Sequence, residues 1–197
     1  MNSRSWCIAL GFATVALSGC AGSDFVRPSE GDLVVGKSTL AEVTTKMGNP
    51  LQSGQMTKNE KPLKISKYAY AASGGESAYP GVTPARSMTF LFHEDKLVGK
   101  EFVSSFKQDS TDFDGQKVAS ISKGKSTKQD VVALLGKPSG EAVYPVIKNA
   151  GDDAYVYSYV QAKGTVFNMK FHNKVLLVSF NPSGVVSDVE YTTSGDQ

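Results

Sequence analysis

Two short segments of the chain, 88 positions apart, place apolar residues at helical spacing. Val43 and Met47 are four residues apart in the first segment, and Val131 and Leu135 are four apart in the second. Side chains at this spacing share one face of a helix, so each segment predicts a short amphipathic helix. A fixed offset of this kind indicates one supersecondary unit that the chain contains twice.

Start and stop signals flank each predicted helix. The sequence Gly-Lys-Ser-Thr stands before both helices, at 36–39 and at 124–127. Glu42 and Asp130 follow the two threonines by three positions, which fits a capping box, where threonine and acid satisfy backbone N–H groups of the first turn. Each helix is followed by Gly-x-Pro, in which glycine allows the left-handed conformation that ends a helix and proline prevents its continuation.

Downstream of each helix, residues alternate between apolar and polar as in half-buried strands. Tyr-Ala-Tyr at 68–70 corresponds to Tyr-Ser-Tyr at 157–159, and residues 88–92 correspond to 176–180. A polar turn follows residues 88–92 and another follows residues 176–180, which indicates a hairpin in each copy. The chain is therefore expected to have an α+β fold with two tandem repeats, each with one or two short helices packed on a three- to four-stranded antiparallel sheet.

The N-terminus has the layout of a secretory signal peptide. A positive residue precedes an apolar run at 6–17, which is too short to span a bilayer, since spanning takes about 20 residues. The run ends in Leu-Ser-Gly-Cys at 17–20, which resembles the bacterial lipobox. The resemblance implies a signal peptide over 1–19, a lipid on Cys20 and a short lipidated tether over 20–23. The alternative is an ordinary secretory signal with a chance cysteine.

Composition and charge narrow the classes of partner. Removal of residues 1–19 takes away Arg4, and the formal charge falls from +2 to +1, which gives no argument for nucleic acid as a partner. Cys20 would then be the only cysteine, so neither a disulfide nor a catalytic thiol is expected. Ala21 stands where aspartate would favour retention at the inner membrane, which points to the outer membrane in a Gram-negative source.

Residues 31–38 formally satisfy the phosphate-loop pattern Gly-x-x-x-x-Gly-Lys-Ser, which binds nucleotides through backbone N–H groups. The preceding segment, however, is polar and contains Pro28, the interior of the match is apolar, and the helix that follows is short. The second copy also has Ala119 in place of the first glycine. We interpret the motif as a turn and a helix cap, and expect neither a nucleotide nor another cofactor.

Catalytic and metal-binding patterns are weak. His93 and His172 are the only histidines, and neither has a cysteine or a second histidine nearby, so no metal site is expected. Residue order alone leaves a Ser-His-Asp triad open. The sequence contains no Gly-x-Ser-x-Gly nucleophile elbow, and we do not expect an enzyme.

Two loops rich in proline, glycine or aromatic residues are candidate partner-binding surfaces, because long loops on a rigid sheet often present such surfaces. The candidate residues are Tyr79, Pro80 and Val82 in the first loop, and Tyr144 and Val146 in the second. The alternative is that both loops only cover edges of the sheet.

The start signal, the Gly-x-Pro stop and the strands that end in a polar turn together resemble the SmpA/OmlA (BamE-like) lipoprotein domain. The resemblance covers residues 24–103 and 112–191, so we divide the chain into a first repeat over 24–106 and a second over 107–197. The tandem form is similar to the β-lactamase-inhibitor-protein architecture.

The resemblance implies a lipid-anchored lipoprotein on the periplasmic side of the outer membrane. Such a protein would bind an envelope protein without catalysis, as an accessory factor in outer-membrane protein assembly or envelope integrity. The alternative, implied by the tandem architecture, is an inhibitor or binder of a periplasmic or secreted hydrolase.

Overall fold

A short helix followed by four strands occurs twice in the computed structural model, which describes residues 22–72, 74–165 and 167–195. The first copy contains α1 (Leu40–Met47), β1 (Gln52–Lys58), β2 (Lys61–Ala71), β3 (Ala85–His93) and β4 (Lys96–Ser104). The second contains the 3₁₀ helix η1 (Gly115–Ser120), α2 (Lys128–Leu135), β5 (Gly140–Val143), β6 (Asp153–Thr165), β7 (Asn168–Phe180) and β8 (Val186–Gly195). The predicted signal peptide and Cys20 lie outside the described residues. Within them, no helix is long and apolar enough to cross a membrane.

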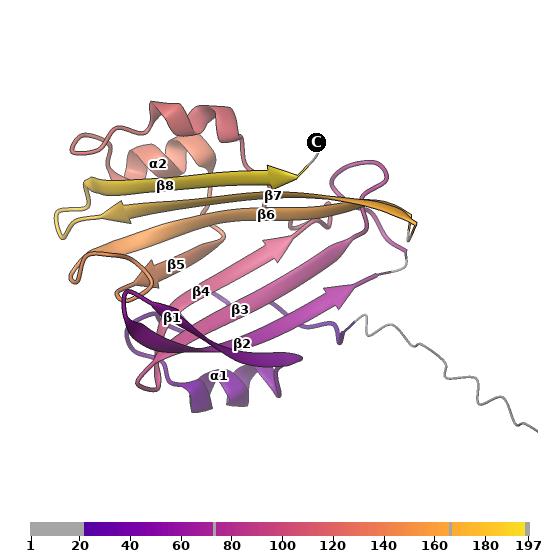
Figure 1. Cartoon of the computed structure of the whole chain (residues 1–197), viewed down its shortest axis with the longest axis horizontal. Helices are drawn as coiled ribbons and strands as arrows, with labels where there is room; N and C mark the ends of the chain where they lie inside the picture. Colours follow the sequence, from indigo (N-terminus) through magenta and orange to yellow (C-terminus); the bar gives the residue numbers. More distant parts are fainter. Residues whose placement is uncertain (1–21, 73, 166, 196–197) are drawn as a thin grey trace, which may run out of the picture.

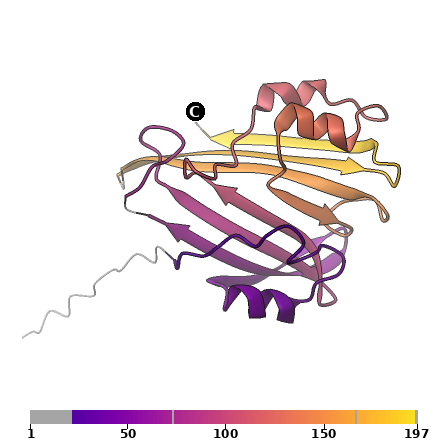
Figure 2. The same ribbon diagram turned by 180° about the vertical axis from the view of Figure 1, so that it is seen from behind.

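All eight strands belong to one antiparallel sheet, and each strand pairs with its neighbour in sequence. The sheet curls, and the helices lie on its outside, α1 beside the first strands and α2 beside the last (Figures 1 and 2). The predicted α+β class, with helices packed on two small separate sheets, is therefore wrong. Strands dominate the described chain, and the two copies share a single sheet.

The two copies join where β4 pairs with β5. The paired residues are Gly99 with Ala142, Lys100 with Glu141, and Glu101 with Gly140. A free edge on β4 would leave a row of backbone N–H and C=O groups unpaired, and β5 satisfies part of that row. The sequence pattern of one copy cannot reveal this pairing, because the partner strand belongs to the other copy.

Both α-helices cover the same face of the sheet. Cross-strand partners share a face, and the register aligns Thr89, Glu101, Gly140, Val156 and Leu177 across five neighbouring strands. Residues adjacent to these in sequence, such as Phe90 and Val178, point the other way and pack in the cores beneath α1 and α2. We call the helix-covered face the outer face and the opposite one the inner face.

The predicted helix caps are confirmed in both copies. Thr39 and Thr127 form capping boxes with Glu42 and Asp130, and their backbone N–H groups donate to the carboxylates at 2.7 and 2.8 Å. The interpretation of Gly-Lys-Ser-Thr as a turn also agrees with the structure, because the Gly36 N–H donates to the Leu97 carbonyl at 2.7 Å. This amide is occupied by the protein's own backbone.

Each copy has its own core on the outer face. Val43 of α1 and Val131 of α2 are buried at equivalent positions in the two cores. The hydroxyls of Tyr68 and Tyr157 donate to the carbonyls of Gly48 and Gly136 at 2.8 and 2.9 Å, which ties each helix end to its sheet. A third cluster lies on the inner face beside the junction of the copies; its buried members are Ala142, Ile147, Ala154 and Val156.

Candidate functional site

The loop between β2 and β3 reaches across to the second repeat. The Thr83 N–H donates to the Ala162 carbonyl on β6 at 2.9 Å, and Val82 forms an isolated β-bridge with Lys163. Val82 is only 6% exposed, whereas Tyr79 is 46% exposed and Pro80 is exposed. Val82 therefore fixes the loop on the second repeat, and Tyr79 and Pro80 form its outer surface.

Tyr79 is held by a charged cluster of the second repeat. Its hydroxyl donates to the Asp112 carboxylate, whose other oxygen lies 2.5 Å from the Lys174 ammonium group. Lys174 also donates to the Phe113 carbonyl at 2.6 Å. The hydrogen bond to Asp112, with a smaller contribution from burial, raises the pKa of Tyr79 to about 12. At neutral pH the Tyr79 phenol is therefore neutral and keeps the hydrogen that it donates to Asp112.

A cleft of about 420 Å³ opens beside Tyr79. The Tyr159 ring forms part of its wall and meets the Tyr79 ring edge-on, with 6.2 Å between centroids. His172 also lines the cleft but is only 5% exposed, and its Nδ1 has no hydrogen-bond partner among the described protein atoms. The His172 side chain is buried because it points to the outer face, beneath the loop that carries Tyr79.

His93 lies near the turn between β3 and β4, as predicted. Its Nδ1 is 3.0 Å from the Pro62 carbonyl, and its Nε2 is 3.8 Å from a carboxylate oxygen of Glu94. Among the residues that the structure describes, no group of three or more His, Cys, Asp or Glu side chains could hold a metal ion. The two histidines lie on different strands of different repeats.

The second candidate loop, between β5 and β6, lies on the inner face. Tyr144 and Val146 are half-buried there. Asn59, in the turn between β1 and β2, donates its Nδ2 group to the carbonyls of Pro145 and Ile147, each at 2.9 Å. The first strand pair thus clamps this loop. Most of β6 separates it from Tyr79, roughly 30 Å along an extended strand, so the two candidate loops form no common surface.

A small cavity of about 180 Å³ opens next to Val146 on the inner face. Its walls are largely apolar and include Leu91, Val156 and Leu177. Glu101 lies at its edge, and burial raises the pKa of this carboxyl, although a hydrogen bond with Ser158 and the charge of a lysine oppose the shift. The cavity can accept a small apolar group and lies beside a carboxylate that is partly removed from water.

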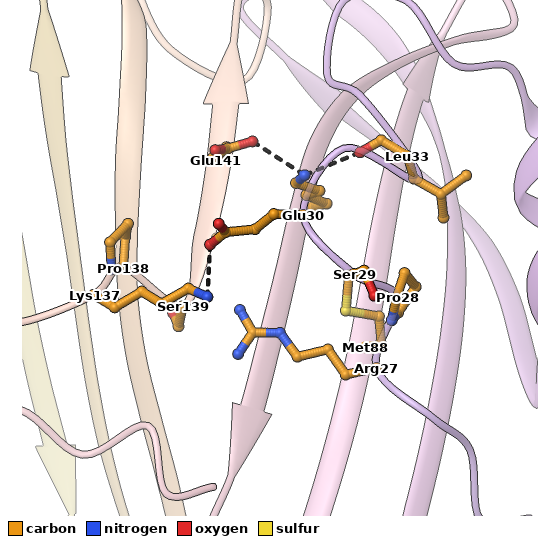
Figure 3. Close-up of a pocket in the computed structure, with 12 residues that line it drawn as sticks. Arg27, Pro28, Ser29, Glu30, Leu33, Met88, Lys137, Pro138, Ser139 and Glu141 are labelled. Carbon is orange, nitrogen blue, oxygen red and sulfur yellow. Dashed lines mark hydrogen bonds and ion pairs between the residues drawn. The ribbon is translucent and has the colours of Figure 1, made fainter.

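A charged pocket of about 180 Å³ lies on the outer face between the repeats (Figure 3). Lys137 of the second repeat is 2.6 Å from Glu30 of the first, and Lys100 is 3.1 Å from Glu141. Arg27 lies over the Phe102 ring at 4.6 Å, and burial lowers the pKa of its guanidinium. These ion pairs connect the repeats across the junction, and the sequence offered no signal for them because their members belong to different copies.

Residues 113–190 match the model of the "Outer membrane protein assembly factor BamE domain". The search of curated proteins found no match. The solved structures include a candidate β-lactamase inhibitor protein from Streptococcus mutans, with 10% sequence identity and a TM-score of 0.38 over 81% of this chain and 90% of that chain. A likeness at this level carries no argument about function.

The predicted resemblance to BamE-like domains is confirmed over residues 113–190. These residues run from Phe113, whose carbonyl accepts a hydrogen bond from Lys174, to Glu190 within β8, which pairs with Leu177 of β7. Asp112 directly precedes the matched region, and Tyr79 comes from the other repeat. The first repeat therefore adds an exposed aromatic side chain to the surface of the BamE-like repeat.

Proposed function

We propose that this protein is a lipid-anchored accessory factor on the periplasmic side of the outer membrane, where it binds a protein that takes part in outer-membrane protein assembly. The match of residues 113–190 to the BamE domain carries the proposal. The lipobox-like sequence at 17–20 supports the anchor. The role is binding rather than catalysis, because the matched family is that of an assembly factor.

The anchor is assigned to Cys20. Two or more acyl chains give stable membrane attachment, whereas one gives only marginal binding. Cys20 precedes the first described residue, Gly22, by two positions, so the two Cα atoms can be at most about 7 Å apart. The folded part of the protein would then lie directly at the membrane surface.

The partner-binding surface is assigned to Tyr79 and the cleft beside it. Exposed aromatic side chains next to open clefts are typical binding hot spots, since they bury a large area at a small entropic cost. Here Tyr79 is held in place by Asp112 and packs against Tyr159, so little rotational freedom remains to be lost on binding. The surface also includes Tyr191 of β8, which is partly exposed in the adjoining cleft.

Photo-crosslinking in cells tests the proposal. A photoreactive amino acid at position 79 is expected to capture a component of the outer-membrane assembly machinery. The same group at Met56, which is similarly exposed on β1, serves as the matched control and should capture far less. Capture of no assembly protein at position 79, together with an intact envelope in the deletion strain, would contradict the proposed partner.

Membrane fractionation tests the anchor separately. Replacement of Cys20 by Ala, with residues 1–19 exchanged for an ordinary cleavable secretory signal, should move the protein from the membrane fraction to the soluble periplasmic fraction. Retention of the Cys20→Ala protein in the membrane fraction would show that a lipid on Cys20 is not what holds it.

A further inference from the structure

The hairpin of β6 and β7 carries an unusual concentration of exposed apolar side chains. Of the eleven large apolar side chains that are exposed in the described chain, four belong to this hairpin: Val160 (43% exposed), Phe167 (96%), Met169 (39%) and Phe171 (58%). Exposed apolar groups that cluster in this way mark an interaction surface. The hairpin is also the longest in the sheet, since each strand has 13 residues.

The hairpin has two chemically different faces. Ala162 pairs with Phe171, and Gly164 pairs with Met169, so these apolar residues lie together on the inner face. Lys163 pairs with Lys170 on the opposite face. An apolar face backed by basic side chains is the arrangement that binds at the surface of an anionic membrane.

The tip of this hairpin lies at the same end of the sheet as the start of the described chain. Gly22 forms a β-bridge with Tyr70 near the end of β2, and the Ala72 N–H donates to Pro84. The Thr83 N–H then donates to Ala162 on β6, which completes a continuous connection from Gly22 to the hairpin. Both ribbon views show the first described residues and the end of the β6–β7 hairpin on the same side of the molecule (Figures 1 and 2).

The backbone groups between β6 and β7 are paired along the whole hairpin, so the groups on its outer edges must bond to headgroups or water, which confines the hairpin to the headgroup boundary. β6 and β7 pair with each other from Asp153 with Phe180 to Thr165 with Asn168. In the described part of the chain, β8 accompanies β7 only as far as His172, and residues 81–83 contact β6 at 162–164, so the last residues of the hairpin extend beyond β8 as an arm. Phe167 lies at the end of this arm, where burial against the rest of the protein is minimal.

We propose that the apolar face and tip of the β6–β7 arm insert into the headgroup boundary of the lipid leaflet that holds Cys20. This proposal depends on the proposed function only through the lipid anchor on Cys20. Aromatic and long apolar side chains are favoured at this boundary. The lipid on Cys20 and the arm then attach the protein to the membrane at two points. These attachments turn the end of the sheet that carries the arm toward the membrane, and they fix the orientation of the Tyr79 cleft.

A single tryptophan reports on insertion. Trp6, the only tryptophan of the sequence, lies in the predicted signal peptide, so Phe167→Trp in a Trp6→Phe background is the only reporter whether or not that segment is removed; we call it the arm reporter. Val132→Trp in the same background, on the exposed side of α2 and at the other end of the sheet, gives the matched control reporter. Each protein is purified in its lipidated form and reconstituted into phosphatidylcholine–phosphatidylglycerol vesicles with brominated acyl chains.

The expected result is a blue-shifted emission of the arm reporter that brominated lipid quenches, while the control reporter keeps a solvent-exposed emission and is not quenched. Quenching of the arm reporter no stronger than that of the control reporter would overturn the proposal. A shift of the arm reporter that requires added envelope protein, and not lipid, would also overturn it, because the arm would then dock on a protein.

The same measurement on the Cys20→Ala protein separates the arm from the anchor. When this protein is added to the same vesicles, the emission of the arm reporter should still shift, although more lipid is needed to reach the same signal. Phe171→Ser in that background should raise the required lipid concentration further, with an unchanged thermal unfolding curve. Failure of the anchor would show in cell fractionation, whereas failure of the arm would show only in the emission of the arm reporter.

Discussion

Replacement of Gly140 by Ala should break the junction between the two halves of the sheet. Gly140 lies on β5 opposite Glu101, and a Cβ atom there would be 2.2 Å from the Lys100 carbonyl oxygen and 2.9 Å from the Glu101 Cα atom. Both neighbours are backbone atoms, so no flexible side chain can move aside. β5 must therefore shift away from β4.

The pairing that this shift disturbs is short. It comprises three residue pairs and the adjoining hydrogen bond from the Phe102 N–H to the Ser139 carbonyl at 2.9 Å. A backbone hydrogen bond contributes about 1 kcal/mol net, so loss of two or three should lower the free energy of unfolding by about 2–3 kcal/mol. Domains of this kind are stabilised by about 5–15 kcal/mol in total, so the loss would be large.

Urea unfolding followed by far-UV circular dichroism measures the effect. Gly54→Ala is the matched control, because Gly54 also lies in a strand and its nearest neighbour to an added Cβ is the Ile65 Cδ1 atom at 4.0 Å. That variant should stay within about 0.5 kcal/mol of the parent protein. Equal unfolding midpoints for Gly140→Ala and Gly54→Ala would refute the reasoning, because the pairing of β4 with β5 would then contribute nothing.

Three further predictions concern caps and titrating groups. Thr39→Ala and Thr127→Ala should each lower the free energy of unfolding by about 1 kcal/mol in urea titrations, through loss of the capping hydroxyl; unchanged midpoints would contradict the caps. Burial raises the pKa of Glu101 in the folded protein above its usual value of 4.5. At a pH above the folded-state pKa, the buried ionised carboxylate therefore lowers the free energy of unfolding, whereas below pH 4.5 the carboxyl is protonated in both states and has no such effect. Glu101→Gln should therefore stabilise the protein near neutral pH and lose this advantage as the pH falls, and a constant difference in urea midpoints would contradict it. Asp112→Asn should lower the pKa of Tyr79 from about 12 toward 10, measured by phenolate absorbance against Tyr79→Phe.

The helices and their ends could be predicted because the signals act within a single turn. The Thr39 side chain accepts a hydrogen bond from the Glu42 N–H, and the Glu42 carboxylate accepts one from the Thr39 N–H. At the other end of the helix, Gly48 adopts a φ of 76°. Val43 and Val131 identified the buried helix faces by spacing alone. These features repeat in the second copy because the same local interactions recur there.

The single sheet could not be predicted, because its junction joins residues whose local patterns carry no strand signal. β5 alternates between buried and exposed positions but has only four residues, and every residue of β1 is exposed, so neither strand has an apolar pattern long enough to be recognised in the sequence. The candidate site, too, could be predicted only in part. Composition identified the loop that contains Tyr79, but its position against Asp112 depends on the packing of one repeat on the other.

The central claim is that the anchored protein binds an outer-membrane assembly component through its BamE-like repeat and Tyr79. The most direct test is affinity purification of the lipidated protein from detergent-solubilised envelopes, with the Tyr79→Ala protein isolated in parallel and the bound proteins identified by mass spectrometry. We expect assembly components with the parent protein and a marked loss of them with Tyr79→Ala. Recovery of a hydrolase in their place, or equal recovery with both proteins, would contradict the account.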